Sequence, residues 1–193
     1  MAQETAPGRV VIVSGPAGSG KTTVLQYLLA ECPLPLTFSV SATTRQPRPG
    51  EKDGVNYHFL TPEEFERRKA ANDFLECFEV HQRGYWYGTL WSEVATGLSD
   101  QKWVILDVDV EGMRAVLQRF PDAITIFISP GSLEELERRL RHRNTETPAD
   151  LERRLAAAPG ELACAPLYQH QITNDIPQRA AAEICHLLLQ VRG

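Results

Sequence analysis

The segment that constrains the fold most strongly is residues 9–22, where a β-branched run leads through a glycine-rich turn into a helix-forming stretch. Residues 9–14 read RVVIVS without alternation of apolar and polar positions, which is typical of a strand buried on both faces. Residues 15–22 read GPAGSGKT and satisfy the pattern G-x-x-x-x-G-K-[ST] in full, and a helix is predicted over Lys21–Glu31. The segment therefore predicts an α/β fold with a loop that holds phosphate groups at a helix N-terminus.

The remainder of the chain alternates between predicted strands and helices. Buried-type strands are predicted over residues 36–41, 103–110 and 123–129, with a weaker candidate at 171–173. Helices are predicted to begin near Thr61, Glu111, Ser132, Thr147 and Pro177. This alternation implies a parallel sheet with right-handed crossovers. Residues 41–90 instead carry hairpin-like signals at 56–60, 74–80 and 85–87, so we expect an inserted antiparallel subdomain there.

The charge balance limits the partners of the chain. Lys and Arg total 20 against 25 for Asp and Glu, which gives a formal net charge of −5 over 193 residues. This balance argues against a protein that wraps duplex DNA or coats an anionic membrane, so we expect neither nucleic acid nor membrane as a partner. A small anionic ligand needs only a local cluster of positive charge, so the negative net charge does not argue against such a ligand.

The four cysteines are Cys32, Cys77, Cys164 and Cys185, and no pair of them has metal-ligand spacing. A chain of this length buries enough surface to fold without disulfides, so we expect reduced thiols rather than a disulfide framework. The first residues, MAQET, carry an acid and lead into only a short apolar run, unlike a signal peptide. The chain is therefore expected to be cytoplasmic.

Each part of the glycine-rich loop has an expected role toward a nucleoside triphosphate. Backbone N–H groups turn toward phosphate oxygens, Lys21 bridges the β- and γ-phosphates, and Thr22 offers its hydroxyl to Mg²⁺. The residues assigned to ATP binding are Gly15, Pro16, Ala17, Gly18, Ser19, Gly20, Lys21, Thr22 and Thr23. Asp107 and Asp109 lie two positions apart on a predicted strand, so their side chains share one face at the sheet edge where ligands bind.

A second polar segment suggests where another phosphate binds. Arg45 and Arg48 lie three positions apart in a loop stiffened by Pro and Gly, and the hydroxyl of Tyr57 follows nine residues later. These groups can converge on one phosphate. Solvated loop arginines are the alternative, and composition by itself does not decide between the two interpretations.

The stretch from Ser39 to Tyr57 reads S-x-S-x-T-T-R-x-x-R-x-G-E-x-x-G-x-x-Y and resembles the signature of guanylate kinases without a break. The resemblance covers residues 8–190 and continues through shorter motifs at Phe74–Glu76, Tyr87–Thr89, Leu106–Asp109, Arg138–Arg143, Arg153–Leu155 and Asn174–Asp175. It implies a P-loop parallel sheet core flanked by helices, with an inserted mixed or antiparallel GMP-binding subdomain and a helical lid. It also implies transfer of the γ-phosphoryl group of ATP to GMP and dGMP, with Mg²⁺ as cofactor, in purine nucleotide metabolism.

The same resemblance divides the chain and assigns roles to its residues. The core comprises residues 8–40, 99–131 and 157–190, the GMP-binding insert residues 41–98, and the lid residues 132–156, which close over bound nucleotides. Arg45, Arg48, Tyr57 and Tyr87 are assigned to the GMP phosphate, Ser41, Glu76 and Thr89 to the guanine base, and Asp107 to the GMP site. Arg139, Arg143 and Arg154 of the lid act in catalysis with Lys21 and Arg45, Asn174 lies near the adenine, and Asp109 reaches Mg²⁺ through water.

The assignment of Glu76 also has a physical basis. Guanine presents N1–H and N2–H₂ as adjacent donors, which suit one acceptor-only carboxylate, and a Ser or Thr hydroxyl can meet O6. Taken outside the signature, Glu76 in the alternating stretch FLECFEV fits a residue on a solvated strand face better than a base-binding residue.

Six arginines fall between residues 138 and 154. Pairing with Glu134, Glu135, Glu137 and Glu152 at i,i+3 and i,i+4 explains some of them. Because phosphoryl transfer uses positioned arginines to stabilise charge, only Arg138, Arg141 and Arg153 are assigned to the surface. No general base is expected, because the acceptor phosphate oxygen is already anionic.

Some residues depart from the family pattern and bear on GMP affinity and lid mobility. They are the longer turn at 81–84, Trp86 in the first aromatic position, Glu111 in place of Gln, Asn144 in place of Gly, and Pro159-Gly160, which is expected to interrupt a stretch that is helical in the family.

Two other functions fit part of the sequence. A guanylate-kinase-like interaction module would carry a degraded P-loop, whereas Lys21 and Thr22 are present here. A kinase of phosphorylated sugars would share the P-loop but not the T-T-R-x-x-R-x-G-E stretch. The predicted function is therefore phosphorylation of GMP.

Overall fold

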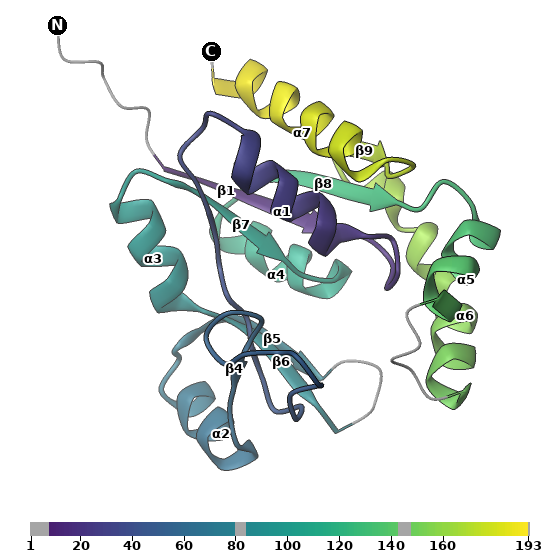
Figure 1. Ribbon diagram of the computed structural model, residues 1–193. Coiled ribbons are helices and arrows are strands. Elements are labelled where there is room, and N and C mark those ends of the chain that lie inside the picture. The colour runs from purple at the N-terminus through teal and green to yellow at the C-terminus, as the bar shows by residue number, and fades with distance from the viewer. Residues whose placement is uncertain (1–7, 80–83, 143–147, 193) are drawn as a thin grey trace, which may run out of the picture. The chain divides into compact units, whose positions relative to one another are not determined.

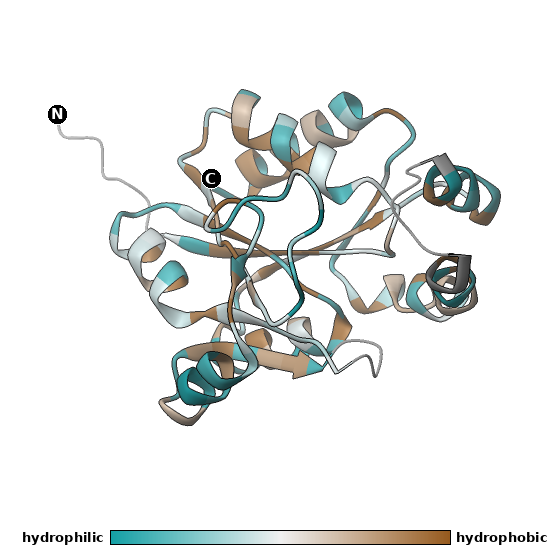
Figure 2. Ribbon diagram, turned by 60° about the horizontal axis from the view of Figure 1, so that its bottom comes forward, coloured by the Kyte–Doolittle hydropathy of each residue, from teal (hydrophilic) through white to brown (hydrophobic). Residues whose placement is uncertain are grey.

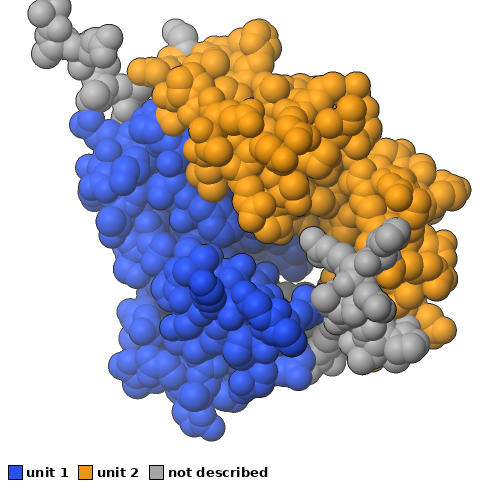
Figure 3. All heavy atoms as spheres, in the orientation of Figure 1, with its two compact units in different colours: residues 1–12, 35–123 blue, residues 13–34, 124–193 orange. Residues whose placement is uncertain are grey.

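The computed structural model describes residues 8–79, 84–142 and 148–192. The chain divides into two compact units: the first unit comprises residues 1–12 and 35–123, and the second unit residues 13–34 and 124–193. Figure 3 shows the first unit in blue and the second in orange. The bounds of these two units differ from those of the expected core, insert and lid. The division into core, insert and lid stays a prediction.

One sheet carries the buried-type strands that the sequence predicts. Its order is β2-β7-β1-β8-β9, with β1 at Arg9–Ser14, β2 at Leu36–Phe38, β7 at Trp103–Asp107, β8 at Ile124–Ser129 and β9 at His170–Thr173. β2 pairs with β7, and β8 with β9, in parallel register. Ile12, Ile105 and Ile126 are all 0% exposed, and Figure 2 shows the central strands largely in the brown of hydrophobic residues. The parallel α/β fold predicted from the sequence is confirmed.

The first unit also holds a four-stranded sheet of order β4-β3-β6-β5. Its strands are β3 at Ala42–Thr43, β4 at His58–Phe59, β5 at Phe74–Glu79 and β6 at Trp86–Leu90. β6 pairs antiparallel with both β3 and β5, whereas β3 and β4 are parallel, so the sheet is mixed. Phe65, Phe74 and Leu90 pack together in its core. The inserted sheet that the hairpin-like signals predict is therefore present.

Three helices belong to the first unit: α2 at Pro62–Ala70, α3 at Trp91–Ser99 and α4 at Val110–Arg119. The predicted cap of α2 is confirmed, because the Thr61 hydroxyl accepts a hydrogen bond from the Glu64 N–H at 3.2 Å. β7 ends earlier than predicted, because Asp109 caps α4 by accepting the Gly112 N–H at 2.8 Å. The sequence analysis missed α3, which begins without the usual signal: its N-cap residue is Leu90, which makes no capping hydrogen bond through its side chain.

The second unit packs its long helices in two pairs. α1 (Lys21–Glu31) lies beside α7 (Pro177–Arg192), and α5 (Leu133–His142) lies beside α6 (Pro148–Leu162), as Figure 1 shows. Leu136, Leu140 and Ala158 form the core of the second pair. The expected interruption at Pro159 is wrong: α6 runs through it, because Pro159 is exposed and water can solvate the carbonyl that loses its partner. Within the described ranges, no helix has the combination of length and apolar character that crossing a membrane requires.

The structure corrects the expectation that all four thiols are reduced. Cys32, at the C-terminal end of α1, and Cys185 in α7 form a disulfide, with their Cα atoms 5.6 Å apart. The packing of α1 against α7 brings these residues together, and the sequence could not show it because they lie 153 positions apart. Cys77 and Cys164 are free thiols.

Reduction of this disulfide should destabilise the protein. Breaking a cross-link over 153 residues returns chain entropy to the unfolded state, and the loss of such a bond typically costs about 2–5 kcal/mol. We expect thermal unfolding at a lower temperature in dithiothreitol, and Cys185→Ser should unfold at that lower temperature with or without reductant. Cys164→Ser is the matched control, since Cys164 is free. Equal melting temperatures for oxidised and reduced wild type would contradict the prediction.

Candidate functional site

The glycine-rich loop of the second unit joins β1 to α1 and ends in a conformation that requires glycine. Gly20 is the N-cap of α1 and has a φ of +87°. A Cβ at this position would lie 2.4 Å from Nδ2 of Asn174, too close for any other residue. The Lys21 ammonium donates to the Gly15 carbonyl at 2.7 Å, so it lies over the loop whose phosphate contacts it is expected to share.

A cavity of about 370 Å³ adjoins this loop in the second unit. Its lining residues are Gly18, Gly20, Thr23, Arg138, Arg139, Asn174 and Pro177. Asn174 is 0% exposed and donates its Nδ2 to the Ser19 carbonyl at 2.7 Å. Its Oδ1 has no hydrogen-bond partner among the described residues. Since buried polar atoms are normally paired, this oxygen is suited to accept a hydrogen bond from a ligand N–H group.

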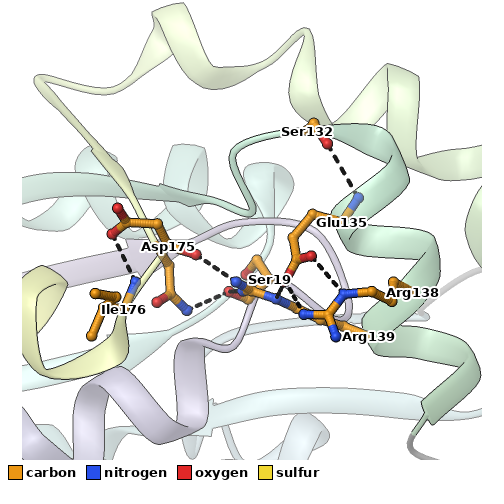
Figure 4. A network of polar contacts seen from close by, with 8 residues as sticks. Ser19, Ser132, Glu135, Arg138, Arg139, Asp175 and Ile176 are labelled. Carbon is orange, nitrogen blue, oxygen red and sulfur yellow. Dashed lines mark hydrogen bonds and ion pairs between the residues drawn. The ribbon is translucent and has the colours of Figure 1, made fainter.

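Arg139 connects α5 to the loop and to the end of β9. Its Nη1 donates to the Ser19 carbonyl at 3.1 Å and its Nη2 to the Asn174 carbonyl at 2.7 Å. Glu135, one helical turn earlier, accepts the Arg139 Nε–H at 2.6 Å and binds Arg138 through both of its oxygens. Figure 4 shows Arg139 between Ser19 and Glu135, with Arg138 on the far side of Glu135. The guanidinium of Arg139 is thus held by three fixed acceptors.

Sequence reasoning and the structure agree only partly on the second unit. The structure brings Gly18, Gly20, Thr23, Arg139 and Asn174 together around the cavity. Arg138, which the sequence analysis assigned to the surface, lines the cavity as well. Arg154 lies in α6 and is half-buried, away from the cavity lining. Arg143, Asn144 and the turn at 81–83 lie outside the described residues.

The first unit gathers most of the residues assigned to the second phosphate. The Arg45 Nε–H donates to the Tyr87 hydroxyl at 3.1 Å, and the Arg45 guanidinium carbon lies 5.4 Å from the centre of the Tyr57 ring. The two tyrosine rings meet edge to face with centroids 5.8 Å apart. Arg48 is in the same loop, where its backbone N–H donates to Glu51 at 2.7 Å. The structure therefore brings the Arg45 guanidinium together with the Tyr87 hydroxyl and the Tyr57 ring.

The residues assigned to the base lie on neighbouring strands of the same unit. Glu76 on β5 and Thr89 on β6 are register partners, and the Thr89 hydroxyl donates to Glu76 Oε1 at 2.6 Å. Burial raises the pKa of Glu76 to about 7; the negative charge of Asp109 adds to this effect, and hydrogen bonds from Thr89 oppose it. A Cβ at Gly112 would lie 3.4 Å from Glu76 Oε2, so the first turn of α4 passes directly beside the carboxyl group.

The remaining assigned residues of the first unit make separate contacts. Burial raises the pKa of Tyr57 to about 12, and the negative charge of Asp107 at the end of β7 contributes to the shift. Ser41 precedes β3, and its carbonyl accepts the His58 N–H at 2.9 Å. Asp109 is exposed and uses Oδ1 to cap α4. Sequence reasoning assigned no role to Glu51, although it lies inside the signature and bonds to Arg45 and Arg48.

A loop with the full G-x-x-x-x-G-K-[ST] pattern between β1 and α1, combined with an inserted mixed sheet, defines a P-loop nucleotide-binding protein of the α/β class. A family model described as guanylate kinase matches residues 7–190. The chain belongs to the guanylate kinase family.

Individual relatives agree with this assignment. The chain is 54% identical over 193 residues to a guanylate kinase of Rhodopirellula baltica, covering 99% of this chain and 92% of the relative. It is 45% identical over 182 residues to a guanylate kinase of Symbiobacterium thermophilum, covering 94% of this chain and 85% of the relative. The crystal structure of guanylate kinase from Anaplasma phagocytophilum matches with a TM-score of 0.79 at 28% identity, over 97% of this chain and 87% of that one.

The raised pKa of Glu76 makes stability depend on pH. The pKa of Glu76 is about 7 in the folded chain and has its ordinary value of 4.5 in the unfolded chain, so the folded state binds one more proton between these pH values. Its contribution to the free energy of unfolding should therefore fall as pH rises from 4.5 to above 7, by at most about 3 kcal/mol. Urea unfolding of the wild type and Glu76→Gln at both ends of this range measures the difference. The free energy of unfolding of Glu76→Gln should increase relative to that of the wild type as pH rises. A difference that does not change with pH would contradict the raised pKa.

Proposed function

We propose that this protein transfers the γ-phosphoryl group of ATP to the phosphate of GMP, giving ADP and GDP. The observation that carries the proposal is the half-buried Glu76 carboxyl on β5, which accepts a hydrogen bond from the Thr89 hydroxyl. In its ionised form this group offers two acceptor oxygens, which match the adjacent N1–H and N2–H₂ donors of guanine. Adenine presents an unprotonated N1 and a C–H at the same edge, so it would leave the carboxylate without a donor.

The proposal for the GMP phosphate rests on the charge and the hydroxyl groups of the first unit. Arg45 and Arg48 supply positive charge, and Tyr57 and Tyr87 supply neutral hydroxyl groups that can donate to a phosphate oxygen. We propose dGMP as a second acceptor, because the assigned residues read the base and the phosphate rather than the ribose. Ser41 and Asp107 complete the proposed GMP site.

The donor nucleotide is proposed to bind in the second unit. The loop from Gly15 to Thr23 and the Lys21 ammonium would hold the phosphates. The buried Oδ1 of Asn174 is proposed to accept from the amino group of adenine. The cavity of about 370 Å³ beside Asn174 is of the size of a small-molecule site.

Mg²⁺ is proposed to arrive with ATP. Thr22 is exposed in the first turn of α1, where its hydroxyl is a hard oxygen ligand of the kind Mg²⁺ prefers. Mg²⁺ takes most of its other ligands from phosphates and water, and Asp109 is proposed to orient one of these waters. When bound, the ion would neutralise charge on the β- and γ-phosphates.

The remaining roles follow the same reaction. Arg139, Arg143 and Arg154 are proposed to stabilise the charge that spreads over the transferred phosphoryl group. We also propose the division into core, insert and lid, with residues 132–156 as the lid that closes on bound nucleotide. The reaction is proposed to belong to purine nucleotide metabolism in the cytoplasm, where ATP is the common phosphoryl donor.

A coupled assay with a panel of acceptors tests the function. We expect GMP and dGMP to be phosphorylated, and AMP, UMP and ribose bisphosphate to be rejected, with AMP lower by ~10⁴-fold in kcat/KM. Glu76→Gln should lose roughly 100-fold in kcat/KM for GMP, because two charge-assisted hydrogen bonds to guanine are weakened, while ATP-analogue binding stays unchanged.

Glu79→Gln is the matched control for this variant, since Glu79 lies on the same strand and is exposed. A Glu76→Gln enzyme that kept the wild-type preference for GMP over AMP would place base recognition elsewhere. A wild type that phosphorylated AMP or a sugar phosphate better than GMP would refute the proposed function.

Lys21→Ala tests the phosphate loop. The substitution removes the positive charge that is proposed to act on the transferred group, so kcat should fall roughly 10²–10³-fold. Lys102→Ala is the control, because Lys102 pairs with Asp100 at 3.0 Å in the first unit and has no proposed contact with nucleotide. A Lys21→Ala enzyme with more than about a tenth of wild-type turnover would show that the role assigned to Lys21 is wrong.

A further inference from the structure

Glu51 and Arg45 form a two-pronged ion pair in the loop that follows β3. Arg45 Nη1 donates to Glu51 Oε2 and Arg45 Nη2 donates to Glu51 Oε1, both at 3.0 Å. The two side chains are only 12% and 19% exposed, so water competes weakly with the pair. Such parallel hydrogen bonds fix the plane of the guanidinium as well as its position.

The five N–H donors of Arg45 can be assigned one by one. Two of them bind Glu51, a third binds the Gln46 carbonyl at 2.7 Å, and Nε–H binds the Tyr87 hydroxyl at 3.1 Å. Among the described residues, one donor is left, the second N–H of Nη2. Since Nη2 and Nε share an edge of the planar group, this donor lies beside the Tyr87 hydroxyl.

Tyr87 supplies a second donor at the same place. Its oxygen accepts the Arg45 Nε–H, so its own hydroxyl hydrogen is available to an outside acceptor. The Arg45 Nη2–H and the Tyr87 O–H therefore form a pair of neighbouring donors. Two such donors suit two oxygens, or one shared oxygen, of a phosphate group.

Glu51 also fixes the loop itself. Its Oε2 accepts the backbone N–H of Arg48 at 2.7 Å, in addition to its bond to Arg45. Burial acts to raise the pKa of Glu51, but Arg45 and Arg48 outweigh it and hold the pKa below its usual value. Glu51 is thus an ionised anchor that joins both arginines of the signature.

We propose that Glu51 is a positioning residue for the GMP phosphate: by occupying the outer edge of the Arg45 guanidinium, it turns the Nε–Nη2 edge and the Tyr87 hydroxyl toward the phosphate. The inference rests on the proposed function and names the residue that aims its phosphate site. A different effect opposes it, because the negative charge of Glu51 also weakens the attraction of the site for an anion. If Glu51 positions Arg45, removing its charge should weaken the binding of GMP. If Glu51 only neutralises Arg45, removing its charge should strengthen the binding of GMP.

Steady-state kinetics of Glu51→Gln provide the test. Gln keeps the size of the side chain but presents an N–H₂ group to either Nη1 or Nη2 of Arg45. The guanidinium can then no longer donate both of its parallel hydrogen bonds to residue 51. We expect KM for GMP to rise roughly 10- to 100-fold, the range for losing hydrogen bonds to a charged group, with KM for ATP unchanged. Glu51→Asp, which keeps the charge, should recover part of the loss.

Glu64→Gln is the matched control, because Glu64 also bridges two arginines, Arg67 and Arg68, but on the surface of α2. If Glu51 acts through the Arg45–Tyr87 pair, the effects of Glu51→Gln and Tyr87→Phe on KM for GMP should be non-additive in the double variant. If Glu51→Gln only disturbs the structure, the two effects should be additive. An unchanged or lower KM for GMP in Glu51→Gln, or additive effects, would overturn the inference. Absence of GMP turnover in the wild type would instead refute the proposed function on which it rests.

Discussion

The backbone carbonyl of Ser19 is the acceptor on which the arrangement of the glycine-rich loop and its neighbours depends. It accepts one hydrogen bond from Asn174 Nδ2 at 2.7 Å and another from Arg139 Nη1 at 3.1 Å. A carbonyl oxygen has two lone pairs, so both are used. The approach of Asn174 is possible only because Gly20 has no Cβ. One backbone group therefore sets the position of the loop, of α5 and of the end of β9 relative to one another within the second unit.

Two carboxyl groups of the first unit lie in opposite electrostatic environments. Glu51 faces Arg45 and the Arg48 N–H, which hold its pKa below the usual value. Glu76 is half-buried, and its loss of contact with water, together with the negative charge of Asp109, raises its pKa to about 7. The first group is a permanent anion that can fix a cation, whereas the second can hold or release a proton near neutral pH. A base with two N–H donors would stabilise its ionised form, so binding of such a base and deprotonation of Glu76 are linked.

The parts of the molecule that the sequence predicts well are those encoded by neighbouring residues. The strand, glycine loop and helix at residues 9–31 follow from local pattern, and so does the cap at Thr61. The resemblance to guanylate kinases was needed to connect Glu76 with Thr89, because the pairing of β5 with β6 is what makes them neighbours. The acceptors of Arg139 lie up to 120 positions away, and no spacing rule reaches that far.

Glu51 shows a different limit of sequence reasoning. It stands in the signature, but a carboxylate in a basic loop can be solvated, can neutralise a charge or can aim one, and only the geometry of its hydrogen bonds separates these roles. The same holds for Arg138, which pairs with Glu135 as a surface arginine would and still lines the cavity.

The bond between Cys32 and Cys185 closes residues 32–185 into a covalent ring. Arg45, the Glu76–Thr89 pair and Asn174 all lie inside the ring, whereas the glycine-rich loop precedes it. A protease that cuts once at an exposed loop residue such as Gly50 opens the ring without releasing a fragment. The two pieces of the nicked chain stay joined until a reductant separates them, so such a cut would stay hidden on a non-reducing gel.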